Sequence, residues 1–332
     1  MKRSRNVIML LVFVMSLCFI SNVYAKDIVW KLSLPYKPVG VYGEAVKWFS
    51  DEINKRSQGR LLVEPYYNNA LKLNVTAPLS AIKDGMVELN LTHMSLTIPE
   101  EPLATLPELP FLFGGDSEAT MNWYFNDFVP VFEKVAANKW GTVMLTPFMA
   151  PPIDIFCKDP IRNMKDMEGL RIRVYGGPPA EMLKLMGAST YFISPAELYT
   201  ALSQGMIKAA ITSVVSAWES NFWEVLKYIN RMNVTFGVGG LYMSKKAYDG
   251  LPRDLQDIVK KVGGEMKVNL VPAMKKYTQD ATQSLIKNGM VEIYPSKEFM
   301  EETAKLAHPL WKKYADQAGP DAVALLKKAG KY

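Results

Sequence analysis

Apolar side chains near the start of this chain alternate between the spacing of a strand and the spacing of a helix. Extended segments rich in β-branched and aromatic residues occupy residues 27–36, 61–67 and 87–94. Helical patterns lie between them, at residues 41–60 and 74–85. This strand–helix–strand–helix–strand order predicts an α/β fold with a mostly parallel sheet that helices cover on both faces.

A similar alternation resumes in the second half of the chain, after a strand pattern at residues 142–148. The proline-rich stretch 149–169 between the two halves is interpreted as a crossover between lobes. A long helical pattern runs from Gly264 to Asn288, and Pro272 is expected to kink it because proline removes an amide donor. Two adjacent α/β units predict a ligand cleft outside the carboxyl ends of their strands.

The N-terminal 25 residues have the pattern of a secretory signal peptide. A basic start is followed by an apolar run and by small residues that end at Ala25. The run is short for a membrane-spanning helix, which needs roughly 20 apolar residues. Cleavage after Ala25 removes three positive charges, which lowers the formal net charge from +6 to +3 and leaves little support for nucleic-acid binding.

Motifs for catalysis and cofactor binding are absent from the sequence. It contains neither a dinucleotide-binding glycine fingerprint nor a P-loop, and no cluster of histidines, cysteines and carboxylates has metal-ligand spacing. Only Cys157 remains after cleavage, so an intramolecular disulfide is impossible, and a buried apolar role for this thiol is favoured over a nucleophile. We therefore expect that the protein is not an enzyme and that it holds no resident metal and no cofactor.

The stretch GLRIRVYGG, residues 169–177, places polar side chains on one face of a short strand. Arg171, Arg173 and Tyr175 alternate with apolar residues, and glycines bound the segment. A guanidinium in the middle of a strand is largely desolvated and needs a fixed anion, for which a carboxylate offers two parallel hydrogen bonds. From position alone, Arg173 has two interpretations, a pair with a structural Asp or Glu and a ligand clamp.

An ordered set of motifs covers the chain after the signal peptide. The set comprises Pro160 to Arg173, Gly187-Ala188, Glu197 to Gly205, Trp223 to Val225, the PELPFLFGG loop at 107–115 and GRLLVEPYYNNAL at 59–71. Taken together, these motifs resemble the DctP-type periplasmic solute-binding subunits of tripartite ATP-independent (TRAP) transporters.

The resemblance implies a two-lobe periplasmic binding protein fold with hinge strands and a long lobe-spanning helix. We expect lobe I to comprise residues 26–150 and 239–278, and lobe II to comprise residues 151–238 and 279–332. In the family, the arginine that maps onto Arg173 clamps the carboxylate of an organic acid. Arg171 is then expected to face solvent or to pair at an edge.

The chain departs from the sialic-acid-binding members of the family. It has no arginine in the APPIDIFCKD stretch after the fourth strand pattern, and Thr212 stands where those members have an asparagine. Sialic acid is therefore not expected as the ligand. The strand ends that should face one cleft give these further ligand-binding candidates: Tyr36, Lys37, His93, Tyr175, Thr212, Ser213 and Phe236.

One arginine among Tyr, His and Phe side chains suits a monocarboxylate, because a dicarboxylate would need a second cation and only Lys37 is available. The resemblance implies a periplasmic protein that closes on a small organic acid and delivers it to the membrane subunits of a TRAP permease, as a monomer or a homodimer. Two alternatives remain open, a ligand-sensing subunit for a membrane receptor and a secreted enzyme acting on a small carboxylate.

Overall fold

The computed structural model describes residues 28–193 and 195–332 of the chain, and the predicted signal peptide lies outside this part. The expected strand–helix alternation of the N-terminal segment is confirmed, and β1 pairs in parallel with both β2 and β3. The elements are β1 (Ile28–Ser33), α2 (Val41–Arg56), β2 (Leu61–Tyr66), α3 (Pro78–Lys83) and β3 (Leu89–His93).

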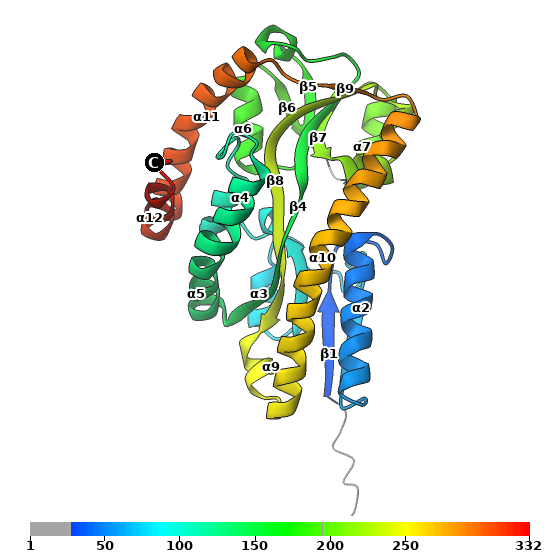
Figure 1. Cartoon of the computed structure of the whole chain (residues 1–332), viewed down its shortest axis with the longest axis vertical. Coiled ribbons are helices and arrows are strands. Elements are labelled where there is room, and N and C mark those ends of the chain that lie inside the picture. Colours follow the sequence, from blue (N-terminus) through cyan, green and yellow to red (C-terminus); the bar gives the residue numbers. More distant parts are fainter. Residues whose placement is uncertain (1–27, 194) are drawn as a thin grey trace, which may run out of the picture.

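Two long antiparallel strands run through the middle of the molecule and join its two halves (Figure 1). They are β4 (Thr142–Cys157) and β8 (Tyr228–Ser244). The sheet is mixed, because β8 pairs antiparallel with both β4 and β3, while the strands of the N-terminal unit pair in parallel as expected. β4 also continues through the stretch that was interpreted as a crossover, with a register shift between Met149 and Pro152 that accommodates the prolines.

The second α/β unit lies on the other side of β4. Its strands add to the same sheet, which has the order β2-β1-β3-β8-β4-β7-β5-β6, with β9 paired to β8. The elements are β5 (Arg171–Val174), α6 (Gly177–Leu185), β6 (Ser189–Phe192), α7 (Pro195–Ser203), β7 (Ala209–Ser213), α8 (Val214–Glu219) and β9 (Val291–Ile293).

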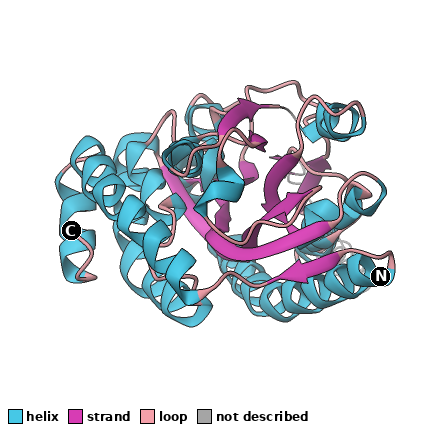
Figure 2. Ribbon diagram, turned by 90° about the horizontal axis from the view of Figure 1, so that it is seen from above, coloured by secondary structure: helices cyan, strands magenta, loops and turns pink. Residues whose placement is uncertain are grey.

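Helices surround the sheet (Figure 2), and one of them extends along most of the molecule beside β4 and β8 (Figure 1). This helix is α10 (Arg253–Lys287), which continues through Pro272 and begins eleven residues before the expected start at Gly264. The remaining helices are η1 (Met94–Leu96), η2 (Pro102–Glu108), α4 (Ser117–Trp123), η3 (Tyr124–Phe128), α5 (Val129–Trp140), η4 (Met164–Met167), η5 (Phe222–Glu224), α9 (Lys245–Asp249), α11 (Lys297–Ala318) and α12 (Pro320–Lys328).

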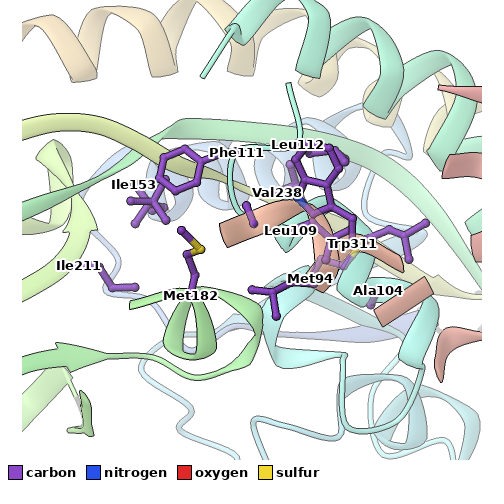
Figure 3. Close-up of a cluster of buried hydrophobic side chains, with 14 of the residues drawn as sticks. Met94, Ala104, Leu109, Phe111, Leu112, Ile153, Met182, Ile211, Val238 and Trp311 are labelled. Carbon is purple, nitrogen blue, oxygen red and sulfur yellow. The ribbon is translucent and has the colours of Figure 1, made fainter. Parts of the chain in front are cut away.

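The largest apolar core continues from one half of the molecule into the other. It joins Ile211 of β7 and Met182 of α6 to Met94, Leu109 and Trp311, which come from η1, from the segment after η2 and from α11 (Figure 3). Burial of these side chains removes apolar surface from water, which stabilises the contact between the segments. The loop that contains Leu109 is thus fixed against both α6 and α11.

Gly239 marks a close approach between the two central strands and β3. A Cβ atom at this position would lie 2.3 Å from the Thr92 carbonyl oxygen and 2.6 Å from Phe148 Cζ. Gly239→Ala is therefore expected to lower the free energy of unfolding by about 1–3 kcal/mol, as overpacking does. Gly264→Ala is the matched control, because α10 leaves open space there and alanine favours a helix by about 0.5–1 kcal/mol. Equal urea midpoints for the two variants would contradict the close packing.

Candidate ligand-binding site

Arg173 lies in the middle of β5, between β6 and β7, with only 6% of its surface exposed. Its Nε donates to the Ile193 carbonyl oxygen at 3.0 Å, and its Nη1 donates to the Ile211 carbonyl oxygen at 3.2 Å. None of the carboxylates in the described ranges forms an ion pair with it. Burial lowers the pKa of Arg173, although a guanidinium stays protonated in proteins.

A buried guanidinium held only by neutral carbonyl groups has an unbalanced positive charge. Burying such a charge costs several kcal/mol unless an anion or further hydrogen bonds compensate it. Arg171, two residues earlier on the same strand, differs because it is exposed and donates from Nη2 to the Gly205 carbonyl oxygen at 2.9 Å. The geometry therefore favours Arg173 over Arg171 for holding an anion.

Tyr175 connects Arg173 to a buried carboxyl group. The guanidinium carbon of Arg173 lies 6.0 Å from the centre of the Tyr175 ring, within reach of a cation–π interaction. The Tyr175 hydroxyl donates to Glu108 Oε2 at 3.4 Å, and the Glu108 carboxyl also hydrogen-bonds to the backbone of Ser95. Glu108 is 2% exposed, and its burial raises the pKa of its carboxyl to about 8. At neutral pH this carboxyl is therefore mostly protonated.

The shifted pKa of Glu108 predicts a pH dependence of stability. Between its usual value of 4.5 and about 8, the folded chain keeps a proton that the unfolded chain has lost, so the free energy of unfolding falls as pH rises. His93 acts in the opposite direction below pH 6.5, because burial lowers its pKa to about 4. Between pH 6.5 and 8, urea unfolding should show that wild type loses roughly 2 kcal/mol relative to Glu108→Gln. Parallel pH profiles would contradict the shift.

A second group of side chains surrounds His93 at the end of β3. The ring of His93 packs edge-on against Tyr36, Tyr42 and Phe148, with centroid distances of 5.7, 5.3 and 5.2 Å. The His93 backbone amide donates to the Tyr36 hydroxyl at 3.2 Å. Since burial lowers the pKa of His93, this group presents aromatic surface and a neutral imidazole at neutral pH.

Thr212 and Ser213 end β7 directly after Ile211, whose carbonyl oxygen accepts a hydrogen bond from Arg173. The Ser213 hydroxyl caps α8, since it accepts from the Ser216 amide at 3.3 Å and donates to Ser216 Oγ at 3.3 Å. Phe236 lies in β8 and lines a small cavity with Pro107. The structure thus brings Thr212 and Ser213 to the Arg173 strands, whereas this cavity places Phe236 beside the loop that contains Glu108.

Lys37 is exposed, and the charge that it faces is Glu219, which is also exposed, at the end of α8. This carboxylate also lies close to Gly40, where a Cβ atom would be 2.9 Å from Glu219 Oε1. Lys37 was the one candidate for the second cation that a dicarboxylate would need. The structure shows that it already faces a protein carboxylate.

Sequence reasoning did not single out Glu108, Tyr42 or Phe148. Glu108 links the two groups of side chains, because it contacts Tyr175 and also Ser95, which lies two residues after His93. The available signal was an acidic residue inside the otherwise apolar and proline-rich segment LPELPFLF. Tyr42 and Phe148 gave no comparable signal, because aromatic residues near a helix start or in a strand are most often part of the core.

A family model described as bacterial extracellular solute-binding protein, family 7, matches residues 37–317. The chain belongs to this family. One relative is a solute-binding protein of Albidiferax ferrireducens, which is 26% identical over 281 residues that cover 81% of this chain and 80% of the relative. The predicted DctP-type solute-binding class is thereby confirmed.

Solved structures confirm the two-lobe fold of this family 7 protein. A Bordetella pertussis extracytoplasmic solute receptor binding pyroglutamic acid has a TM-score of 0.84 and 23% identity, and the match covers 92% of this chain and 100% of that chain. A TRAP periplasmic solute-binding protein from Chromohalobacter salexigens with bound D-glucuronate has a TM-score of 0.81 and 19% identity, with coverage of 90% and 98%.

Other chemistry is scarce in the described part of this solute-binding protein. Within it, no group of three or more His, Cys, Asp or Glu side chains could hold a metal ion. The helices from α2 to α12 include none that is both long and apolar enough to span a bilayer. Cys157 is buried, as expected, and burial raises the pKa of its thiol to about 12, which disfavours the reactive thiolate.

Proposed function

We propose that this family 7 protein captures a small organic acid and that Arg173 holds the carboxylate of that acid. The supporting observation is a buried guanidinium that pairs with backbone carbonyls and with none of the described carboxylates. A ligand carboxylate would supply the missing negative charge and two charge-assisted hydrogen bonds. Tyr36, His93, Tyr175, Thr212, Ser213 and Phe236 complete the proposed lining, with Lys37 at its exposed edge.

The ligands of the similar structures are consistent with this proposal. Pyroglutamic acid and D-glucuronate, which the Bordetella and Chromohalobacter proteins bind, are both monocarboxylic acids. Further similar structures hold β-D-galacturonate and orotic acid, which also carry a single carboxyl group. These acids differ in size and ring type, so they indicate the chemical class of the ligand and leave the particular acid to experiment.

The acid would bind between the two proposed lobes, residues 26–150 with 239–278 and residues 151–238 with 279–332. β4, β8 and α10 connect these lobes, so they are the candidate hinges for closure on the ligand. We further propose that the chain is exported to the periplasm with cleavage after Ala25, acts without turnover and delivers its ligand to a TRAP permease. An ion gradient rather than a nucleotide on this subunit would then drive transport.

A thermal-shift experiment tests this function on the purified mature chain. The probes are pyroglutamate, D-glucuronate, D-galacturonate and orotate, each compared with its neutral carboxamide. At least one acid should raise the midpoint of unfolding, because a ligand that binds only the folded state stabilises it, whereas its amide should not. Equal shifts from an acid and its amide, or no shift from any acid, would contradict the proposal. Product formed from a bound acid would favour the alternative of a secreted enzyme.

A further inference from the structure

Glu108 ends η2, and two other elements hold the segment around it in place. The Thr235 hydroxyl donates to the Pro107 carbonyl oxygen at 3.2 Å, and the Phe111 amide donates to the Val234 carbonyl oxygen at 2.8 Å. On the other side, Trp311 Nε1 of α11 donates to the Pro110 carbonyl oxygen at 2.8 Å. The carboxyl of Glu108 is therefore attached to a segment that the crossing strand β8 and the helix α11 both fix.

Burial raises the pKa of the Glu108 carboxyl and favours its neutral form, whereas its two hydrogen-bond partners lower that pKa. Its hydrogen-bond partners are the Tyr175 hydroxyl and the Ser95 backbone, and the Tyr124 hydroxyl, which donates to the Gly239 carbonyl oxygen, also faces it. Several charged groups on the elements that pack against η2 have partners of their own. These contacts are Glu181 with Lys313, Lys328 with Asp127, Arg231 with Asp154, and the ring of His308 against Trp311.

We propose that Glu108 is a positioning residue for ligand binding, which holds Tyr175 beside Arg173 and leaves the positive charge of the arginine to the ligand. The hydroxyl of Tyr175 is bound to Glu108, and its ring lies beside the guanidinium. An ionised Glu108 would place a negative charge on the hydrogen-bond partner of Tyr175, whose ring centre lies 6.0 Å from the Arg173 guanidinium carbon, and this charge would oppose binding of the acid's carboxylate. This inference rests on the proposed function of Arg173 as the ligand clamp.

The prediction for ligand affinity follows from the two states of this carboxyl. When Glu108 loses its proton, the new charge should weaken binding of an acid, so wild-type affinity should fall about tenfold between about pH 7 and about pH 9. Glu108→Gln keeps an acceptor for Tyr175 and Ser95 and cannot ionise. Its affinity at about pH 7 should stay within about threefold of wild type, and its pH profile should be flat.

Glu101→Gln is the matched control, because Glu101 is also a buried glutamate and caps the same helix η2. It pairs with Lys139 at 2.9 Å and accepts from Trp140 Nε1 at 3.2 Å, away from Tyr175. This variant should be less stable than wild type and should keep the wild-type pH profile of affinity. Glu108→Leu, which removes the acceptor, should weaken binding about tenfold or more at every pH.

Isothermal titration of the mature chain with the most stabilising of the four acids separates the outcomes. A flat profile for Glu108→Gln beside a falling profile for wild type and Glu101→Gln would support the positioning role. Identical profiles for all three proteins, or wild-type affinity in Glu108→Leu, would overturn it. If Glu108→Leu does not fold, the Glu108→Gln profile decides alone. Failure of every acid to bind wild type would instead count against the proposed function and would remove the basis of the inference.

Discussion

Replacing Arg173 with methionine is expected to weaken binding of the organic acid by about 100-fold or more. Loss of one partner from a buried, hydrogen-bonded charge pair costs about 2–5 kcal/mol, and each 1.4 kcal/mol changes the dissociation constant tenfold. Methionine retains much of the apolar volume of the side chain, so the loss would report the missing guanidinium. Isothermal titration with an acid that stabilises wild type measures the effect.

Arg171→Met provides the control on the same strand. Arg171 is exposed and its guanidinium contacts only the Gly205 carbonyl oxygen among the hydrogen bonds of the described residues, so this variant should bind within about threefold of wild type. Without ligand, Arg173→Met should be as stable as wild type or more stable, because it removes an uncompensated buried charge. A variant that loses stability and keeps its affinity would show that Arg173 is structural.

Replacing Asp154 with alanine is expected to lower the free energy of unfolding by about 3–5 kcal/mol, because it removes one of the two carboxylate partners of a partly buried arginine and the acceptor of the Asn233 amide. Asp154 is 1% exposed, and its Oδ2 accepts from Arg231 Nη1 at 2.9 Å. Arg231 also donates from Nε to Glu292 Oε1 at 2.7 Å. The network ties β4 to β8 and β9, so urea unfolding should show a large loss from this one change.

Asp280→Ala is the corresponding control on the surface. Asp280 pairs with Lys276 at 2.6 Å within α10, but the side chains are 48% and 75% exposed, respectively. Exposed pairs of this kind contribute about 0–1 kcal/mol, so the variant should unfold close to wild type. Similar losses for Asp154→Ala and Asp280→Ala would mean that the buried network has no special role in joining the strands.

Local patterns in the sequence predicted the N-terminal unit, because each strand or helix there carries its own apolar spacing. The same reasoning could not predict that β4 continues past Pro151 and Pro152. Tolerance of proline there depends on a register shift against β8, which is a property of the paired strands and not of either one alone. The mixed sheet escaped prediction for the same reason.

The candidate site was predictable only in part. Alternation placed Arg171 and Arg173 on the same face of one strand, and the family resemblance singled out Arg173 as the expected clamp. The Glu108–Tyr175 contact spans 67 residues of sequence, and the Asp154–Arg231 pair spans 77. Contacts over such sequence separations depend on the tertiary fold, so the residue types alone did not reveal which charged side chains pair with each other and which, like Arg173, have no carboxylate partner among the described residues.

A crystal structure of the mature chain with its bound acid tests the central proposal most directly. We expect a ligand carboxylate oxygen about 2.7–2.9 Å from the guanidinium nitrogens of Arg173, the range of charge-assisted hydrogen bonds. Tyr175 should remain in contact with a neutral Glu108 in that complex. A ligand whose carboxylate lies away from Arg173, or an Arg173 that pairs with a carboxylate of the protein when the acid is bound, would contradict the proposal.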